Sequence, residues 1–368
     1  MKKVVFVAIL AIISLGTQAQ ITGVLHYLPT MSNYQAESYR HYDVITVDPE
    51  VIFNSPDALR MLRHDNPDIK IFLYVNITEW YVPMFPDKTW SIYILNELEK
   101  HEGWWLHGTD RKRIEFWHGT KTMNLSINGL KVKIGGRKVS YVEYITEHLI
   151  KDVIGEYKRQ GIRLDGAHFD QVLPKPFDWL GHYCNNHYGL DRDGDGKEDQ
   201  PGPANIQWRL GMQYCMEKIR DSQGQNFVII GNGGNGFFLK TNSGKVLCNG
   251  KQFEDFPDKY LDEGEAKTGG WLANMNNASN LDVVMFNARK DNWLFTIASA
   301  MLLNNVIFAY SQNSPYEDKF NLNLGNPTTK FMQNGQEFSR QYEKGKVYVN
   351  PYTKKAWIEY KTGKVLKE

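Results

Sequence analysis

Acidic residues stand at the ends of two apolar segments of the sequence. Residues 166–173 read GAHFDQVL and contain Asp170, and residues 252–256 read QFEDF and contain Glu254. Two carboxyl groups that face one glycosidic bond can cleave it, because one protonates the leaving oxygen while the other acts as nucleophile or base. Asp170 and Glu254 are therefore predicted to form a catalytic pair.

The neighbours of these residues leave one choice open. Successive side chains of a strand point to opposite faces, so only one of Glu254 and Asp255 points inward. Glu254 shares its face with Gln252, which favours Glu254 as the second acid, and Asp255 is the alternative. Asp165 precedes its strand, so it is expected to be a turn or capping residue at the structural end of the sheet.

Amide, carboxylate, aromatic and guanidinium side chains follow the other apolar segments. Such side chains offer the donors, acceptors and flat apolar faces that sugar rings require. Any one of them is more simply explained as a loop residue, but their recurrence after the strands predicts a substrate site. The predicted substrate-binding residues are Asn76, Glu79, Trp80, Asn232, Asn287, Arg289 and Gln312.

The segment DRDGDGKED, residues 191–199, matches the first nine positions of a calcium-binding loop. The predicted ligands are Asp191, Asp193, Asp195, Lys197 (at the position that uses a backbone oxygen) and Asp199. Gly202 replaces the twelfth-position glutamate of an EF-hand, so a shortened loop with a structural Ca²⁺ is expected. The alternative is a solvated acidic turn, in which the carboxylates would repel each other without a cation.

Apolar runs alternate with helical patterns along most of the chain. The predicted strands are residues 23–28, 42–48, 69–77, 166–173, 226–231, 245–253, 282–287 and 305–310, and the predicted helices are 55–64, 141–160, 205–220, 267–277 and 291–303. Mostly continuous apolar strands are typical of a parallel sheet that is buried on both faces. Eight strands with intervening helices predict a (β/α)8 TIM barrel. An open doubly wound sheet is the alternative, although no glycine-rich dinucleotide fingerprint follows the first strand.

Two segments do not fit the alternating pattern. Residues 101–138 predict a hairpin insertion after the third strand, with its turn at Gly119 and Thr120, above the mouth of the barrel. Residues 347–360 contain two alternating runs joined by an Asn-Pro turn, which predicts a C-terminal β-hairpin. The expected organisation is a barrel domain over residues 20–340 and a packed hairpin over residues 341–368.

The amino terminus predicts export. Lys2 and Lys3 precede the apolar run 4–15, and small residues lead to a cleavage point after Ala19. This pattern is typical of a secretory signal peptide over residues 1–19, and it implies a secreted or periplasmic protein. Export permits a disulfide between Cys184 and Cys215, but three buried thiols are at least as consistent with the sequence.

The charge balance excludes some partners. The chain has 43 basic and 42 acidic residues and a net charge of +1, which argues against nucleic acid or an anionic membrane as the main partner. The remaining apolar runs are too short to cross a bilayer. The mature protein is expected to be a soluble monomer that needs no organic cofactor.

Three motifs resemble a known group of proteins. The segments DGAHFDQV, NGKQFEDF and VYVNPYTKKAWIEY are similar to hypothetical-glycosidase TIM-barrel families related to the endo-α-1,4-polygalactosaminidase type. The resemblance spans most of residues 21–360 and implies a glycoside hydrolase with Asp170 at the end of its fourth strand and Glu254 two strands later. The arrangement also resembles the α-galactosidase clan, which implies that Asp170 is the nucleophile and Glu254 the acid/base.

Two function classes therefore compete. The first is an exported glycoside hydrolase that acts on a poly- or oligosaccharide. The second is a non-catalytic glycan-binding barrel that offers Trp80, Trp104, Trp105 and Trp117 as stacking platforms. A calcium-dependent phosphodiesterase is less favoured, because amides and carboxylates rather than histidine and arginine clusters follow the strands.

Overall fold

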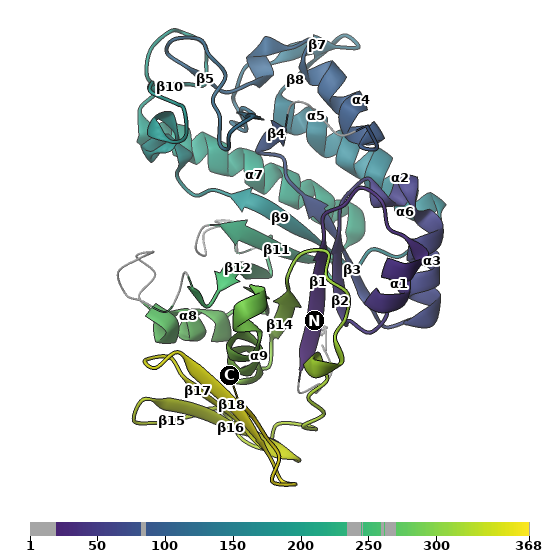
Figure 1. The fold of residues 1–368 in the computed structure, drawn as a ribbon. Helices are drawn as coiled ribbons and strands as arrows, with labels where there is room; N and C mark the ends of the chain where they lie inside the picture. Colours follow the sequence, from purple (N-terminus) through teal and green to yellow (C-terminus); the bar gives the residue numbers. More distant parts are fainter. Residues whose placement is uncertain are drawn as a thin grey trace, which may run out of the picture.

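A closed barrel of eight parallel strands forms the centre of the molecule (Figure 1). The computed structural model describes residues 20–81, 86–233, 244, 246–258, 261 and 270–367, so the predicted signal peptide lies outside the described residues. The strands are β1 (Ile21–His26), β2 (Val44–Val47), β3 (Lys70–Val75), β9 (Gly166–Val172), β11 (Val228–Gly233), β12 (Gly250–Phe256), β13 (Val283–Ala288) and β14 (Val306–Tyr310). They follow one another around the barrel in chain order, and β14 closes it by pairing with β1. The predicted (β/α)8 barrel is confirmed.

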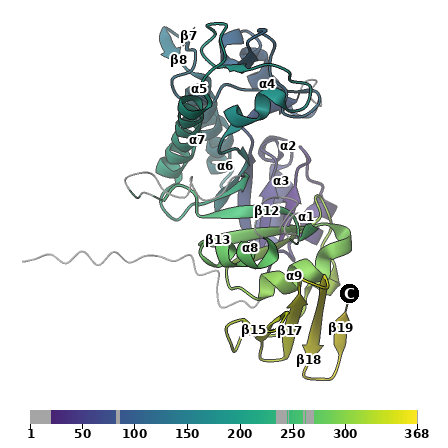
Figure 2. The same cartoon turned by 90° about the vertical axis from the view of Figure 1, so that its left-hand side faces the viewer.

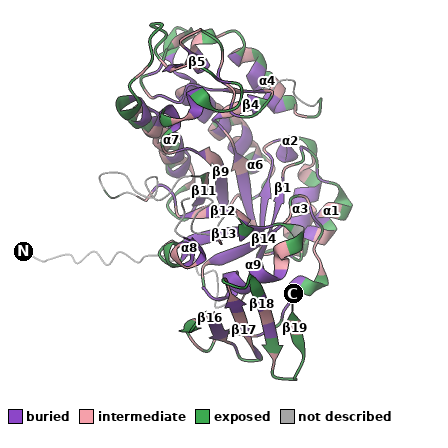
Figure 3. Ribbon diagram, turned by 60° about the vertical axis from the view of Figure 1, so that its left-hand side comes forward, coloured by how far each residue is buried: buried purple, intermediate pink, exposed green. Residues whose placement is uncertain are grey.

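The strands are apolar because both of their faces are buried (Figure 3). Inward side chains form one cluster, made of Ile21, Leu25, Val44, Phe72, Val228, Ile230, Val283, Met285, Ile307 and Ala309. Outward side chains such as Val24 and Ile45 belong to a second, larger cluster that includes the surrounding helices. Gly250 lies at a tight strand contact, where an added Cβ would be 1.6 Å from the carbonyl oxygen of Val283.

Helices cover the outside of the barrel. They are α1 (Asn33–Tyr39), α2 (Val51–Asn54), α3 (Pro56–Asp65), α4 (Thr89–Leu98), α5 (Tyr141–His148), α6 (Gly155–Arg159), α7 (Pro201–Gln223), α8 (Gly270–Ser279) and α9 (Trp293–Met301). A π-helical segment, Leu149–Ile154, joins α5 to α6, so the predicted helix over 141–160 is one continuous unit. Ser140 and Glu143 begin it with a capping box. Within the described ranges, no helix combines the length and apolar character needed to cross a membrane.

The segments that follow β3 and β9 build a layer above the barrel (Figures 1 and 2). Three small antiparallel pairs hold it together, namely β4 (Glu79–Tyr81) with β6 (Thr120–Thr122), β5 (His107–Gly108) with β10 (Leu190–Asp191), and β7 (Val132–Ile134) with β8 (Arg137–Val139). In the part of the chain that the structure describes, short 3₁₀ helices span Glu102–Trp104, Pro176–Asp178, Leu180–His182, Lys290–Asn292 and Asp318–Phe320.

The insertion differs from the predicted hairpin in its pairing. A turn does occur at Gly119, but β6 pairs with β4. Two backbone hydrogen bonds, from the Thr120 amide to the Trp117 carbonyl and from the Thr122 amide to the Ile114 carbonyl, replace the expected strand pairing. The hairpin in this insertion is β7–β8, which turns at Gly135 and Gly136 with φ values of 53° and 85°. Glycine adopts such left-handed backbone readily, which explains the position of this turn.

The carboxyl-terminal segment forms a five-stranded antiparallel sheet. Its strands are β15 (Met332–Asn334), β16 (Glu337–Gln341), β17 (Gly345–Asn350), β18 (Lys355–Tyr360) and β19 (Val365–Lys367). The predicted hairpin is β17–β18, and the whole sheet begins before residue 341. Arg340 anchors it to the end of α9 by donating to the carbonyl oxygens of Met301 (3.2 Å) and Leu303 (2.9 Å).

All three cysteines are free thiols. Cys215 and Cys248 are buried and Cys184 is exposed, so the disulfide considered between Cys184 and Cys215 is not formed. Burial raises the pKa of the Cys215 thiol to about 12, which leaves it protonated and unreactive at neutral pH.

Candidate active site

Asp170 lies at the carboxyl end of β9 and accepts three hydrogen bonds. The Tyr74 hydroxyl donates to Oδ2 at 2.6 Å, while Oδ1 accepts from Asn232 Nδ2 at 2.9 Å and from the Gln171 amide at 2.8 Å. Three donors of this kind fix the direction of a carboxylate. Both oxygens of Asp170 are therefore held in place at the end of β9.

Two β-bulges place Asp170 and Glu254 in equivalent positions. In β9, Asp170 and Gln171 together lie opposite the single residue Asn232, because the register shifts between Phe169 and Val172. In β12, Glu254 and Asp255 lie opposite the single residue Asn287. The second residue of each bulge has a left-handed backbone, with φ of 53° at Gln171 and 55° at Asp255.

Left-handed backbone is uncommon for residues other than glycine, and bulges commonly re-aim a side chain near a functional site. The same type of β-bulge thus occurs on β9 and β12, which are separated by one strand of the barrel, β11. Asp170 and Glu254 each come immediately before the left-handed residue, and in β12 that left-handed residue, Asp255, is acidic as well.

Glu254 and Asp255 have different surroundings. Asp255 forms a two-point ion pair with Arg289, with distances of 3.0 Å to Nε and 2.8 Å to Nη2. Burial, then the negative charges of Asp170 and Glu254, raise the pKa of the Tyr27 hydroxyl. Tyr27 packs against the inner cluster of the barrel, so Asp170 and Glu254 both lie within electrostatic range of one interior side chain. This geometry favours Glu254 over Asp255 as the partner of Asp170.

Glu79 adds a third carboxyl group. Burial raises the pKa of Glu79 to about 7. The Thr120 side chain opposes this shift, the charge of Asp170 adds to it, and Asn76 has a smaller opposing effect. Its Oε1 lies 3.4 Å from Asn76 Nδ2, and its Oε2 is buried without a hydrogen-bond partner. A carboxyl group with a pKa near neutrality can act as a general acid.

Sequence reasoning assigned Glu79 to substrate binding and gave no sign of this environment. The position of Glu79 depends on the pairing of β4 with β6, whose residues lie about forty positions apart in the chain. No local motif encodes such a pairing. The raised pKa is therefore a property of the folded insertion.

The pKa of Glu79 predicts a pH-dependent stability. Because its folded-state pKa of about 7 exceeds the ordinary 4.5, its contribution to stability is present below pH 4.5 and is lost as the pH rises through 7. Glu79→Gln should therefore match the wild type near pH 4 and exceed it at pH 8 by about 2–3 kcal/mol. Urea unfolding across this pH range measures the difference. Glu37→Gln changes an exposed carboxyl group on α1 and should show no such dependence on pH. If the effect of Glu79→Gln on stability does not depend on pH, the pKa of Glu79 is not raised.

Aromatic side chains and a neutral histidine lie beneath the carboxyl groups. The rings of Tyr27 and Tyr74 are 4.6 Å apart, and His168 lies 6.0 Å from Tyr74. Burial lowers the pKa of His168 to about 4, although the charge of Asp170 opposes the shift. His168 is therefore uncharged at neutral pH and adds no positive charge below the site.

The carboxyl groups of Asp170, Glu254 and Glu79 are called the carboxyl cluster below. Some of the predicted substrate-binding residues contact this cluster and others lie elsewhere. Asn76 and Asn232 contact Glu79 and Asp170, respectively. Asn287 is buried opposite the β12 bulge and donates to the Ala309 carbonyl at 3.4 Å. Arg289 is paired with Asp255, and Gln312 is exposed beyond the end of β14.

Three of the four tryptophans considered as stacking platforms are core residues. Trp80, Trp104 and Trp105 are 6%, 0% and 1% exposed, so the expectation that they present ring faces to a sugar is wrong. Their indole nitrogens donate to the Tyr141 hydroxyl, the Val139 carbonyl and the Leu98 carbonyl, respectively. They are buried because the insertion needs an apolar core of its own. Trp117 is 50% exposed.

The acidic loop after β10 gathers three of its carboxylates. Oxygens of Asp191, Asp193 and Asp195 lie within 4.8 Å of one another. Asp191 is buried, and its carboxylate accepts the amides of Gly194, Asp195 and Gly196 at 2.8–3.2 Å. This oxygen-only donor set fits a hard cation such as Ca²⁺.

The other two predicted ligands of this loop are arranged differently. Asp199 forms an ion pair with Arg192 at 3.1 Å and accepts its amide at 2.6 Å. The Lys197 side chain is exposed, with Nζ 3.9 Å from Asp195. The three neighbouring aspartates are thus the part of the predicted set that fits a cation best.

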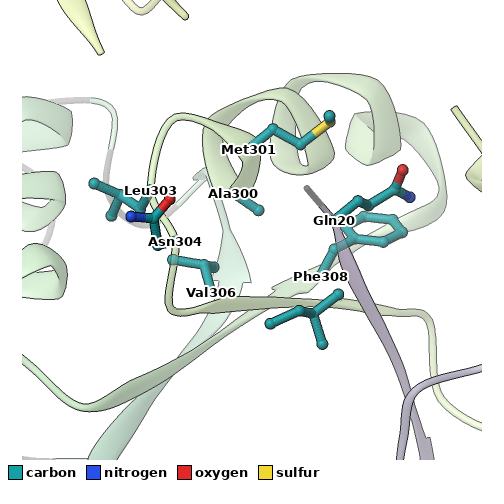
Figure 4. Close-up of a pocket in the computed structure, with 8 residues that line it drawn as sticks. Gln20, Ala300, Met301, Leu303, Asn304, Val306 and Phe308 are labelled. Atoms are coloured by element: carbon teal, nitrogen blue, oxygen red, sulfur yellow. The ribbon is translucent and has the colours of Figure 1, made fainter. Parts of the chain in front are cut away.

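Two cavities lie away from the carboxyl cluster. One has a volume of about 1010 Å³ and lies at the amino ends of the strands, where Phe72 and Val228 are among its lining residues. The other has a volume of about 10 Å³ and lies beside α9 (Figure 4). The smaller cavity has room for about one water molecule.

Asp165 lies at the amino end of the barrel strands, where it pairs with Arg63 at 2.7 Å and Arg163 at 2.9 Å, which confirms its structural role.

Comparison with protein-family models finds no match, and neither does comparison with curated proteins. Among solved structures, the chain is similar to an α-amylase from Geobacillus thermoleovorans complexed with acarbose (10% identity, 88% of this chain, 85% of that chain, TM-score 0.45). It is also similar to the GH31 dextranase of Flavobacterium johnsoniae complexed with glucose (8% identity, 83% of this chain, 38% of that chain, TM-score 0.46). A third similar structure is the cycloalternan-forming enzyme of Listeria monocytogenes (10% identity, 82% of this chain, 29% of that chain, TM-score 0.45). The chain thus spans well under half of the last two proteins. The likeness concerns the fold, so the activity of this chain is inferred from its own residues.

Proposed function

We propose that this protein is an exported glycoside hydrolase that cleaves a poly- or oligosaccharide with Asp170 and Glu254. The observation that supports the proposal is the pair of matching bulges on alternate strands, of which one contains Asp170 and the other contains Glu254 and Asp255. Tyr27 lies within electrostatic range of both residues. In TIM-barrel enzymes this end of the barrel holds the catalytic groups.

The surroundings of the two carboxyl groups support different roles. Asp170 is held by three donors, which suits a nucleophile that must be correctly oriented. Glu254 then serves as the acid that protonates the leaving oxygen. Tyr74 and Asn232 are positioning residues, because they contact Asp170. A retaining mechanism requires the two carboxyl groups to be about 5–5.5 Å apart, and an inverting one about 6.5–9.5 Å.

The names of the structural neighbours are consistent with a carbohydrate substrate. They include an amylase, a dextranase and an α-xylosidase. The proposed substrate class for this chain is accordingly a glycan.

A glycan panel tests the proposal. The mature chain, residues 20–368, should release reducing ends from at least one neutral, acidic or amino-sugar polysaccharide, and proton NMR of the first-formed anomer should separate retention from inversion. If the protein binds a glycan of the panel but releases no product from any, the non-catalytic glycan-binding barrel replaces the hydrolase. The exposed Trp117 is the observation that keeps this alternative open.

We further propose that Asp191, Asp193 and Asp195 hold a structural Ca²⁺ that stiffens the layer above the barrel. Asp191 lies on β10, which pairs with β5 of the insertion, so an ion here would stiffen the loop next to that strand pair. A cation would also relieve the repulsion among the three carboxylates.

Calcium removal should lower the thermal stability of the protein. Binding at about 100 times the dissociation constant stabilises a fold by about 2.7 kcal/mol, so EDTA should lower the melting temperature by a few degrees. Differential scanning calorimetry with and without Ca²⁺ measures this shift. Asp193→Ala should abolish the response to Ca²⁺, whereas Asp57→Ala, at an exposed carboxylate on α3, should keep it. Equal melting temperatures of the wild type in Ca²⁺ and in EDTA would refute the site.

A further inference from the structure

Four aromatic side chains form a partly exposed cluster in the layer above the barrel. Phe116 and Trp117 come from the insertion after β3, and Trp179 and Tyr183 come from the segment after β9. Ring centroids lie 5.0 Å apart for Phe116 and Trp117, 5.2 Å for Trp179 and Tyr183, and 6.0 Å for Trp117 and Tyr183. These four residues are named the aromatic rim.

The aromatic rim presents part of its ring surface to solvent. Trp117 is 50% exposed and Tyr183 is 37% exposed, while Phe116 beneath them is 5% exposed. Large apolar side chains that are exposed together, and held in place by a buried neighbour, commonly mark a binding surface. Phe116 contacts each of the other three rings, so it packs at the centre of the rim.

One residue connects the aromatic rim to the carboxyl cluster. The Trp117 amide donates to the Thr120 hydroxyl at 2.9 Å, and that hydroxyl donates back to the Trp117 carbonyl at 2.9 Å. The Thr120 side chain also lies against the Glu79 carboxyl group, which in turn lies within electrostatic range of Asp170. The backbone of Trp117 is therefore joined to β6, the strand that pairs with β4 and its residue Glu79.

Polar residues from the same two segments line a cavity, and the aromatic residue in its lining is Tyr188. This cavity of about 530 Å³ lies between residues 112–121 and 185–188, and Glu115, Lys121, Asn185 and Asn186 are among its lining residues. Lys121 pairs with Glu115 at 2.6 Å, and Asn185 Nδ2 donates to Glu115 at 3.1 Å. Carboxylate, ammonium and amide groups beside aromatic faces provide the donors, acceptors and stacking surface that a sugar ring needs.

We infer that the aromatic rim and this cavity form a carbohydrate subsite that holds part of a polysaccharide chain beyond the bond that is cleaved. The inference rests on the proposed hydrolase function and deepens it, because it assigns the enzyme a substrate of several sugar units. Trp117 and Tyr183 supply the stacking faces. The alternative occupant, an aromatic or apolar segment of another protein, would not use the polar lining of the cavity.

The double variant Trp117→Ala/Tyr183→Ala tests the subsite. Its mobility is measured in native gels that contain a soluble α-glucan, β-glucan, pectic galactan or chitosan, and its kcat/KM is measured on a cleaved polysaccharide and on an aryl monoglycoside. We expect about a tenfold weaker affinity and about a tenfold lower kcat/KM on the polysaccharide, with an unchanged kcat/KM on the aryl monoglycoside. Tyr352→Ala, at a 62% exposed tyrosine of the carboxyl-terminal sheet, is the matched control and should behave as the wild type.

The possible outcomes separate the subsite from the hydrolase function. A double variant with wild-type mobility and wild-type polysaccharide turnover overturns the subsite. An equal loss on both substrates, with an unchanged melting temperature, also overturns it, because the residues would then act at the cleaved bond. A wild type that cleaves the aryl monoglycoside but is retarded by none of the gels overturns the subsite and leaves the hydrolase intact. Absence of both retardation and hydrolysis overturns both proposals.

Discussion

Asp170→Asn should abolish hydrolysis while the protein stays folded and keeps its glycan affinity. The amide oxygen can still accept from Asn232 and from the Gln171 backbone, so the local structure has a replacement for two of its three hydrogen bonds. An amide, however, is not a nucleophile and carries no negative charge toward a developing oxocarbenium ion. We expect kcat/KM to fall by about 10⁴-fold or more on any glycan that the wild type cleaves.

The controls for Asp170→Asn isolate the chemical step. Asp68→Asn removes an exposed carboxylate before β3, at the opposite end of the barrel, and should leave the turnover unchanged. Calorimetric titration with the cleaved glycan should show comparable affinity for Asp170→Asn and the wild type. Turnover by Asp170→Asn within tenfold of the wild type would remove Asp170 from the mechanism.

Glu254→Gln should have the second-largest effect, and the effect should depend on the leaving group. General acid catalysis commonly contributes 10²–10⁴-fold, so hydrolysis of a natural glycan should fall by about 10³-fold. A dinitrophenyl glycoside has a leaving group that departs without protonation, so bond cleavage in this substrate should be much less affected. Pre-steady-state release of dinitrophenol measures the cleavage step directly.

The same pair of substrates distinguishes Glu254 from its neighbours. Asp255→Asn breaks the ion pair with Arg289 and should impair both substrates to a similar, smaller extent. Glu79→Gln tests the other nearby carboxyl group, whose pKa of about 7 suits an acid. If Glu79→Gln rather than Glu254→Gln shows the dependence on leaving group, then Glu79 is the proton donor and the assignment of Glu254 is wrong.

The barrel itself could be predicted from local patterns. A strand buried on both faces needs a continuous apolar run, and a run such as 282–287 is recognisable without any knowledge of its neighbours. The position of Asp170 followed from the same reasoning, because the carboxyl end of a parallel strand is known once the strand is known. The turn structure of the acidic loop is also local, since Asp191 accepts hydrogen bonds from amides within five residues of it.

The sequence by itself therefore determined the eight strands, the end of the barrel at which Asp170 lies and the acidic loop. Only the tertiary structure decided which tryptophans are core residues, that Asp255 pairs with Arg289, and that Glu79 lies near Asp170. The physical reason is the range of the interactions. Strand periodicity and turns are set by residues a few positions apart, whereas burial, ion pairing and pKa depend on segments that the chain brings together from tens of residues away.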